Sequence, residues 1–308
     1  MITVLAGGVG GARFVSGLAG IVDPRELTII VNTGDDIELH GLHISPDLDT
    51  ICYTLAGWAD PVRGWGISSD SYSCLDQLER LGESTWFRLG DRDLATHILR
   101  SGAMHAGMTL TEFTSHLASQ MDIHATILPM TDAYVPTFVD TADGHMHLQE
   151  YFVREQCRPA VRGFHYTHVD RCQPAPGVLE SIEDADAVII APSNPFISIQ
   201  PILAVPGVRA ALSGVRSRVA AISPIIQGSA VKGPAAVMLQ QMGCEVSAAG
   251  VAGIYREIAA LFVIDRLDSN LSTRIQELGM RTLITETLMT TRSEKEALAR
   301  AVLDAMNR

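Results

Sequence analysis

Several features that would place this chain in a class at once are missing from its sequence. No stretch approaches the roughly 20 consecutive apolar residues that a membrane-spanning helix needs, so we expect no membrane association. The five cysteines are scattered and contain no C-x-x-C pair, which argues against a zinc knuckle and favours a reducing, cytoplasmic compartment. No basic, then apolar, segment begins the chain, so we expect no signal peptide. A G-x-S-x-G nucleophile elbow is also missing.

Basic residues are scarce as well. The chain carries 23 Lys and Arg against 35 Asp and Glu, a net charge of −12. An acidic surface repels phosphate backbones, which argues against nucleic acid as the main partner. A small phosphorylated ligand is compatible with this charge, because a bound metal or a local basic cluster can reverse the field at one site.

The two ends of the chain alternate between strand and helix patterns. An apolar strand at 2–6, a glycine run and a helix over 12–18 lead into a second buried strand at 27–31. Further strands are expected at 187–191, 219–222 and 261–264, each after a helical segment (179–185, 208–215 and 255–260). This alternation predicts an α/β fold with a doubly wound, mostly parallel, Rossmann-like sheet. A last helix over 293–306 is expected to begin with Ser293 as its cap and Glu296 as the capping-box partner.

The middle of the chain has a different pattern. Helical periodicity over 48–55, 71–81, 93–99 and 111–121 precedes two short strands at 137–140 and 145–150, which an Asp-Gly turn would join as a hairpin. We therefore predict a core of residues 1–44 and 176–308, with 45–175 as a helix-rich insertion that carries a small antiparallel piece.

The glycine run is the first candidate site. Residues 6–13 read Ala-Gly-Gly-Val-Gly-Gly-Ala-Arg between the first strand and the first helix. Glycines there let the backbone approach a phosphate, with free N–H groups of the helix aimed at it. The run lacks the lysine of a Walker A loop, and Arg13 stands where a dinucleotide fingerprint has its third glycine. The alternative is a tight turn with close helix–strand packing.

Acidic residues follow the second strand. Asn32-Thr33-Gly34-Asp35-Asp36 lies at a carboxyl end of the predicted sheet, where ligands bind in such folds. Asp35 and Asp36 could hold Mg²⁺ or a ribose, or could cap the next segment. Asp47 and Asp49 fall in the first turns of a helix, where acids favour the helix dipole. For Asp47 that structural explanation is preferred, and for Asp49 both explanations remain open.

Three further loops carry candidate ligands. In 86–93, Trp86 and Phe87 could stack on a flat heterocycle while Arg88 pairs with an anion, although local ion pairs at a helix start explain the segment equally well. Ser193 and Asn194 follow one predicted strand, and a Gly-rich loop with Lys232 follows the next. Lysine occurs only twice in the chain, so Lys232 is a candidate phosphate ligand.

Together these segments resemble one known family. The motifs at 6–13, 32–36, 45–50, 86–93, 192–195 and 232–234 are similar, in the same order, to those of the 2-phospho-L-lactate transferase (CofD) family. Each motif alone is weak, but six in order are specific. The resemblance extends from residue 1 to about residue 268, nearly the whole chain.

The resemblance implies a step in the biosynthesis of coenzyme F-420. Such an enzyme transfers 2-phospholactate from lactyl-2-diphospho-5′-guanosine (LPPG) to the ribityl hydroxyl of the deazaflavin Fo (7,8-didemethyl-8-hydroxy-5-deazariboflavin), releases GMP and requires Mg²⁺. Some bacterial members use a phosphoenolpyruvate-derived donor instead.

The resemblance also suggests roles for particular residues. Asp49 and Arg88 would contact Fo, and Asp49 with Asp35 would be catalytic. Mg²⁺ would lie on some of Asp35, Asp36 and Asp49. The nucleotide and its phosphates would be bound by Gly8, Val9, Gly10, Gly11, Asn32, Thr33, Ser193, Asn194 and Lys232. A homodimer is expected from base rates alone.

Two other functions remain open. One is a regulatory protein of the same fold that binds a nucleotide sugar, of the gluconeogenesis-factor type. Its members carry a Gly-Gly-Ser-Ser-Gly-Arg type of run after the second strand, where this chain reads Ile37-Glu38-Leu39-His40-Gly41. The other is a Rossmann dehydrogenase, which Arg13 at the third glycine position disfavours.

Overall fold

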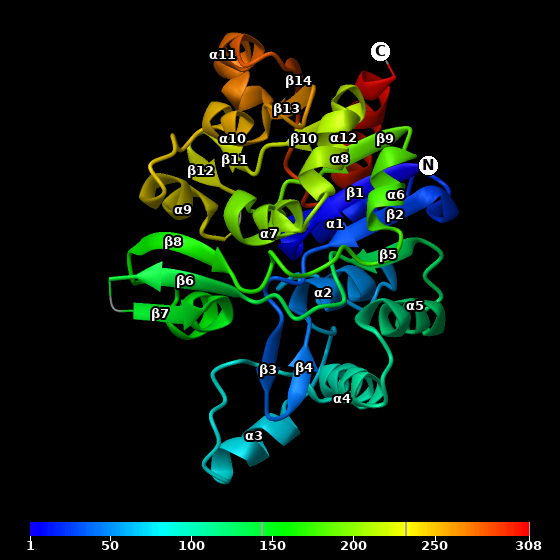
Figure 1. Ribbon diagram of the computed structural model, residues 1–308, viewed down its shortest axis with the longest axis vertical. Coiled ribbons are helices and arrows are strands. Elements are labelled where there is room, and N and C mark those ends of the chain that lie inside the picture. The colour runs from blue at the N-terminus through cyan, green and yellow to red at the C-terminus, as the bar shows by residue number, and fades with distance from the viewer. Residues whose placement is uncertain (143, 232, 308) are drawn as a thin grey trace.

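A parallel sheet forms the centre of the molecule (Figure 1). The structure is a computed structural model that describes residues 1–142, 144–231 and 233–307. Seven strands lie side by side, and every neighbouring pair is parallel. Their order is β14 (Arg281–Thr285), β13 (Leu261–Asp265), β10 (Val219–Ile222), β9 (Ala187–Ile190), β1 (Ile2–Ala6), β2 (Leu27–Val31) and β5 (Thr126–Pro129). The predicted α/β fold with a mostly parallel sheet is confirmed.

Both faces of the sheet are covered, which explains why its inner strands are apolar throughout. Along β1, Val4 packs into one hydrophobic core and Leu5 into the other. One face carries α1 (Gly8–Ala19), α2 (Pro46–Leu55), α5 (Leu110–Gln120) and α12 (Arg292–Met306). The other carries α6 (Val178–Glu183), α7 (Gln200–Ala204), α8 (Val208–Gly214), α9 (Ala235–Gln241), α10 (Ala248–Tyr255) and α11 (Ser272–Glu277).

The two edge strands were not predicted from the sequence. In β14, Thr282, Leu283 and Thr285 are partly covered while Arg281 and Ile284 are exposed, because this strand has a neighbour on one side only. The edge strand β5 is four residues long and ends in a proline, so neither strand has the long apolar run of a buried strand. Since β5 lies within the predicted insertion of residues 45–175, that segment also completes the central sheet. The division into core and insertion otherwise stays a prediction.

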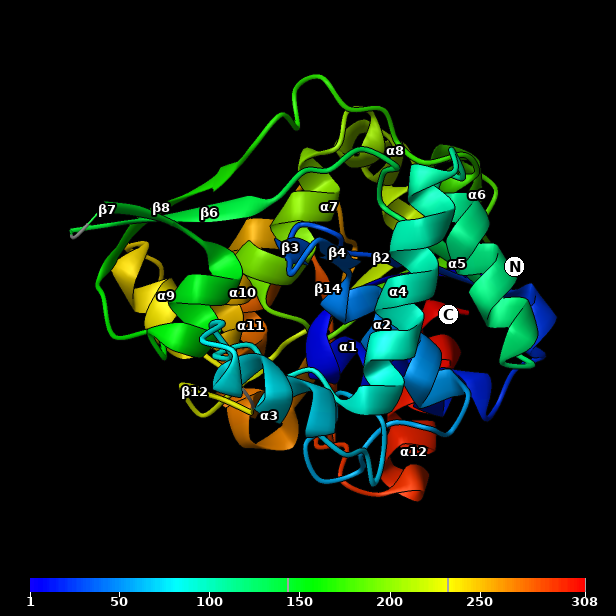
Figure 2. The ribbon, with the colours of Figure 1, turned by 90° about the horizontal axis from the view of Figure 1, so that it is seen from below.

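Several elements between residues 37 and 166 lie outside the central sheet. Figures 1 and 2 show a hairpin of β3 (Ile37–Leu39) and β4 (Leu42–Ile44) beside α4 (Asp91–His105), with α3 (Ser73–Arg80) farther out. A separate antiparallel sheet holds β6 (Thr137–Thr141), β7 (Gly144–His147) and β8 (Val161–Tyr166). The predicted hairpin is thus present, but its Asp-Gly turn includes residue 143, which lies outside the described residues.

Several predicted helix ends are wrong. The helix over 255–260 instead ends at Tyr255, as α10. The helix predicted over 111–121 begins at Leu110, as α5, with Thr109 as its cap and Glu112 as its capping-box partner. In α12, Thr291 and Glu294 form the capping box, not Ser293 and Glu296. There the periodicity located the helix correctly, but Ser293 with Glu296 fitted the same cap pattern two residues away.

Small elements complete the fold. Short 3₁₀ helices lie at Pro24–Glu26, Arg216–Arg218 and Arg266–Leu271, π-helical turns at Glu150–Arg154 and Pro195–Ile199, and a two-stranded ribbon at β11 (Ile225–Ile226) and β12 (Ser229–Ala230). Within the described ranges no single helix is long and apolar enough to cross a bilayer. Only the helical segments 195–204 and 208–214 taken together, with a 90° bend between them, meet that length and composition.

The strand order locates the crevice where a ligand is expected. From β1 the chain first adds β2 and β5 on one side, and later adds β9, β10, β13 and β14 on the other. The order therefore reverses between β1 and β9. In open α/β sheets, ligands bind outside the carboxyl ends of the strands at such a reversal. The loops that leave β1 and β9 should form that site.

Candidate active site

A cleft of about 530 Å³ opens at this reversal. It extends from the loops after β1 and β9 to the β3–β4 hairpin, α2 and the segment before α4. Among the residues singled out from the sequence, it is lined by Gly8, Val9, Gly10, Asp35, Asp49, Arg88, Ser193 and Asn194. Gly11, Asn32, Thr33 and Asp36 do not line it, and Lys232 lies outside the described residues.

The glycine turn is clamped to the loop after β9. Ser193 Oγ donates to the carbonyl oxygen of Gly7 at 2.7 Å and accepts from its N–H at 3.3 Å. A β-carbon on Gly10 would lie 2.5 Å from the carbonyl oxygen of Pro192, and one on Gly11 would lie 2.8 Å from Ser193 Oγ. Close packing thus explains Gly10 and Gly11, as the alternative to phosphate binding anticipated.

Gly8 has a different reason to be glycine. Its φ of +64° is a backbone conformation that other residues rarely adopt. The helix α1 begins at Gly8, four residues earlier than predicted, so the run forms its first turn. The N–H of Gly8 donates to Asp47 Oδ1 at 2.7 Å. No side chain within the described ranges accepts from the N–H of Val9 or Gly10, and both residues face the cleft. These two N–H groups are available to an anion.

Two carboxylates meet beside the glycine turn. Asn32, fully buried, donates through Nδ2 to Asp35 Oδ1 at 3.3 Å and to Asp47 Oδ2 at 2.9 Å. Burial raises the pKa of Asp47 to about 6, despite the hydrogen bonds from Asn32 and Gly8. Burial and the charges of Asp47 and Asp36 raise the pKa of Asp35 well above its usual range. The pair has no basic partner among the described residues and would be stabilised by a cation.

Asp47 was not selected from the sequence as a site residue. Its place in a first helical turn favoured a helix-dipole role, yet the carboxylate also holds the N–H of Gly8 and lines the cleft. Nothing in the local sequence distinguishes these roles, because the contact joins residues 39 positions apart.

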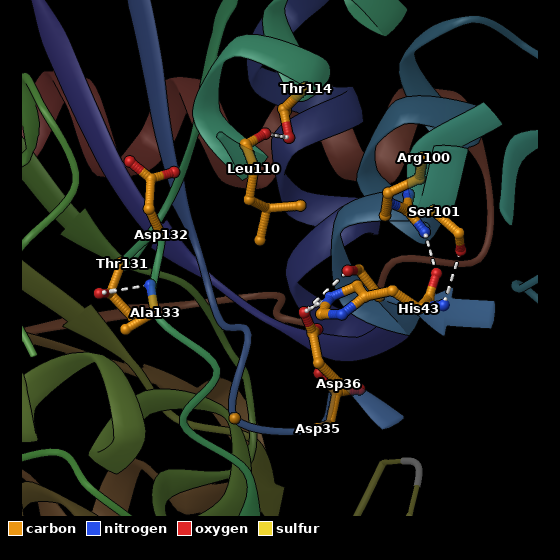
Figure 3. Close-up of polar contacts among 12 residues, drawn as sticks. Asp35, Asp36, His43, Arg100, Ser101, Leu110, Thr114, Thr131, Asp132 and Ala133 are labelled. Carbon is orange, nitrogen blue, oxygen red and sulfur yellow. Dashed lines mark hydrogen bonds and ion pairs between the residues drawn. The ribbon is translucent and has the colours of Figure 1, made fainter. Parts of the chain in front are cut away.

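Asp36 is not among the residues that line the cleft, and Figure 3 shows its contact with His43. Its Oδ2 accepts from Ser45 Oγ at 2.8 Å and lies 2.9 Å from His43 Nε2. Burial raises its pKa, and the contacts with His43 and Ser45 oppose that shift. Through Oδ2 this carboxylate links the β3–β4 hairpin to the start of α2, while its buried Oδ1 has no hydrogen-bond partner among the described residues. The use of Asp36 as a metal ligand stays a prediction.

Asp49 is paired with a buried cation. Arg100 Nη1 donates to Asp49 Oδ2 at 3.1 Å, and Nη2 donates to Oδ1, which makes a two-pronged ion pair. Asp49 is only 4% exposed but lines the cleft, whereas Arg100 lies behind it. Asp49, Asp93 and His97 also present ligand atoms within 4.8 Å of one another. Because Arg100 already balances Asp49, a metal would meet a positive charge there.

Aromatic side chains line the far end of the cleft. Trp86 and Phe87 pack edge to face with ring centroids 5.6 Å apart, and Trp65 and Phe152 lie nearby in the lining. The guanidinium of Arg88 stacks 4.3 Å above the ring of Tyr72. Flat, apolar walls with one cation at the rim suit a polycyclic ring that carries polar groups.

Several predicted ligand-binding side chains form hydrogen bonds within the protein. The side chain of Asn194 caps the π-helical turn at 195–199 by accepting from the N–H of Phe196, and Asn32 ties Asp35 to Asp47. The hydroxyl of Thr33 is buried and has no hydrogen-bond partner among the described residues. Both hydrogen bonds of Ser193 Oγ are made with Gly7. Of the predicted phosphate-binding set, Val9 and Gly10 present unused donors to the cleft.

The sequence comparisons agree with this geometry. The family described as "2-phospho-L-lactate transferase CofD" matches residues 2–301. The chain belongs to the CofD family. A 2-phospho-L-lactate transferase of Methanosarcina mazei is 39% identical over 302 residues, covering 98% of this chain and 99% of that one. A phosphoenolpyruvate transferase of Mycolicibacterium smegmatis is 39% identical over 319 residues, covering 98% of each.

The fold has solved counterparts. A protein member of the upf0052 family from Bacillus halodurans superposes with a TM-score of 0.64 at 17% identity and covers 98% of both chains. That likeness concerns the fold alone. Family membership makes this CofD-family chain a transferase of a phosphate-containing group, as the sequence motifs predicted. The cleft unites an anion site, acidic residues and an aromatic wall, the parts such a transfer needs.

Proposed function

We propose that this protein transfers 2-phospholactate from LPPG to the ribityl hydroxyl of Fo, with release of GMP. In this reaction the hydroxyl oxygen forms a bond to the phosphorus that carries the lactate, and the bond from that phosphorus to the GMP oxygen breaks. The hydroxyl proton passes to an acceptor in the cleft. One observation carries the proposal: a single cleft joins the free N–H groups of the glycine turn to the aromatic wall.

The parts of the cleft match the parts of the two substrates. The N–H groups of Val9 and Gly10 would hold the diphosphate, since helix N-termini bind such groups. Trp86 and Phe87 would cover the deazaflavin ring, and Arg88 would contact it at the rim. Asp49, which also lines the cleft, would accept the hydrogen bond of the attacking hydroxyl. The aromatic cover would also keep water from the donor.

Mg²⁺ fits the pair Asp35 and Asp47. These carboxylates are buried side by side with raised pKa values, and no basic side chain in the described ranges offsets them. Carboxylate oxygens are preferred Mg²⁺ ligands. When bound, the ion supplies charge neutralisation at the diphosphate. Of the three predicted ligands, Asp35 has no basic partner among the described residues, whereas Asp36 contacts His43 and Asp49 is paired with Arg100.

The test is a transfer assay with purified protein, Fo, Mg²⁺ and each of two donors, LPPG and its phosphoenolpyruvyl analogue, read by mass spectrometry. Relatives of both names share 39% identity with this chain, so identity alone does not choose the donor. We expect Asp49→Asn to lower kcat/KM about 100-fold, and transfer within a few-fold of the wild type would remove Asp49 from the site. Chelation of Mg²⁺ should abolish transfer.

Binding of Fo separates this proposal from a regulatory nucleotide-sugar protein. Fo fluorescence should change on binding, and Arg88→Ala should weaken that titration, whereas an unchanged titration would remove Arg88 from the ring site. Gel filtration would test the expected homodimer. The cytoplasmic location stays a prediction from cysteine usage.

A further inference from the structure

Arg100 is the bulkiest of the fully buried side chains in the described part of the chain, with 1% of it exposed. Burying a guanidinium costs several kcal/mol unless ion pairs and hydrogen bonds compensate it. Burial therefore opposes the charge, but Asp49 outweighs that effect, and the pKa of Arg100 is raised. The side chain stays charged inside the protein, in a place where an apolar residue would usually stand.

The contacts of Arg100 fix it on several sides. Both terminal nitrogens donate to the carboxylate of Asp49. Nη1 also lies 3.4 Å from the carbonyl oxygen of His43 and 3.3 Å from His97 Nδ1. The ring of Phe113 packs against the guanidinium, 5.4 Å from centroid to Cζ. A planar fork whose two terminal nitrogens are bonded and whose face packs on a ring has little freedom to rotate.

These contacts connect the elements that form one wall of the cleft. Arg100 comes from α4, Asp49 from α2 and His43 from β4. Figure 3 shows the junction: the N–H of His43 donates to Ser101 Oγ at 2.8 Å while its carbonyl accepts from Arg100. The predicted helix stopped at residue 99, so sequence periodicity did not include Arg100.

Asp49 differs from its neighbours in one respect. Asp35 and Asp47 have no cation partner among the described residues, whereas Asp49 is balanced by Arg100 from behind and faces the cleft in front. A neutralised, immobile carboxylate attracts a second cation weakly but still accepts a hydrogen bond from a hydroxyl. Within 15 residues of sequence, the charges thus distinguish a cation site at Asp35 and Asp47 from a hydrogen-bond acceptor for a hydroxyl at Asp49.

We propose that Arg100 is a positioning residue for the transfer. Its two-pronged ion pair holds the Asp49 carboxylate in the orientation that receives the hydroxyl of the acceptor, and keeps Asp49 from joining the cation at Asp35 and Asp47. Arg100 itself touches no substrate and acts only through Asp49. This inference rests on the proposed function, because it assigns Asp49 to the acceptor hydroxyl.

A double-mutant cycle tests the proposal. Arg100→Lys keeps the charge but replaces the fork with one point donor. We expect kcat/KM for the acceptor to fall about 30-fold while KM for the donor stays within 2-fold, because misplacement of an orienting group costs on this order. If Arg100 acts through Asp49, Arg100→Lys should add less than about 3-fold to the loss in Asp49→Asn, since residues that act as a unit are not additive.

Two further variants keep the test decisive. Arg92→Lys, on the exposed start of the same helix, should have wild-type kinetics. Phe113→Leu removes the supporting ring and leaves the ion pair, so kcat should fall about 3-fold. If thermal unfolding shows that Arg100→Lys does not fold, Phe113→Leu takes its place in the cycle with Asp49→Asn.

The outcomes separate the two proposals. If the wild type is active and the losses of the two single variants multiply in the double variant, the role of Arg100 is refuted but the proposed function is not. A purely structural ion pair would lower activity independently of Asp49. Wild-type acceptor kinetics in Arg100→Lys would refute it equally. A wild type that transfers from neither donor refutes the proposed function, and the role of Arg100 with it.

Discussion

The close approach of Gly10 to the loop after β9 allows a quantitative test of how the cleft is built. In Gly10→Ala the new β-carbon would lie 2.5 Å from the carbonyl oxygen of Pro192, and ordinary contact begins near 3.4 Å. The start of α1 and the loop must therefore separate by 3.4 − 2.5 = 0.9 Å. Neither contact atom is the end of a flexible side chain, so the backbone itself has to move.

The expected energy follows from two opposing effects. Forcing an extra carbon into a close-packed contact costs about 1–3 kcal/mol. Replacing a helical glycine by alanine gains about 0.5–1 kcal/mol. The net effect of Gly10→Ala should thus be a loss of about 1–2 kcal/mol of unfolding free energy. Gly102→Ala is the matched control, because Gly102 lies in α4 and a β-carbon there meets nothing within 4 Å.

The assay is thermal unfolding of both variants beside the wild type, followed by donor kinetics. Gly102→Ala should gain about 0.5–1 kcal/mol, so the two variants should differ in Tm by about 5 °C. Gly10→Ala should also lower kcat/KM for the donor about 10-fold or more, since the N–H groups of Val9 and Gly10 move with the turn. Equal Tm values and wild-type donor kinetics in both variants would show that the helix and the loop are not in the contact described.

Two other substitutions test particular features of the structure. Burial raises the pKa of Asp47 from 3.8 to about 6. The folded wild type therefore binds this proton more tightly than the unfolded chain and loses stability as pH rises through that range. Without Mg²⁺, the unfolding free energy of Asp47→Asn should rise relative to that of the wild type by up to about 3 kcal/mol between pH 4 and pH 7, and a pH-independent difference would contradict the shift. Thr291→Ala should cost about 1 kcal/mol by removing the cap of α12, whereas Ser293→Ala should be neutral within about 0.5 kcal/mol; the reverse order in urea unfolding would restore Ser293 as the cap.

The sequence predicts the inner sheet well for a physical reason. Strands buried on both faces need unbroken apolar runs, as in Ile2–Ala6 and Leu27–Val31, and such runs are visible without any partner. Edge strands such as β14 are covered only in part and leave no such run. The loops at the carboxyl ends of the inner strands could therefore be selected as candidate sites, and most of them meet at the cleft.

What the sequence could not resolve is which residue in each motif faces the ligand. Gly8 and Gly10 belong to one run, yet one is required by its backbone conformation and the other by Pro192, 182 residues away. Asp35 and Asp36 are adjacent, but only Asp35 lines the cleft. Contacts between distant segments decide these roles, and neither local periodicity nor motif spacing encodes them.

The charge of the cleft gives the proposed metal requirement a physical cause. Its described lining includes the carboxylates of Asp35, Asp47, Asp49 and Asp93, with Arg13 and Arg88 as lining cations. Arg100 offsets Asp49 from behind, and the hydrogen bonds of His97 and Tyr53 to Asp93 hold the pKa of that carboxyl low although burial opposes them. A diphosphate that enters this cleft adds further negative charge beside Asp35 and Asp47, two carboxylates that have no basic partner within the described ranges. Two free N–H groups do not balance that charge. We therefore expect the donor to bind strongly only together with a divalent cation, so that donor affinity measured by calorimetry falls steeply when Mg²⁺ is withheld.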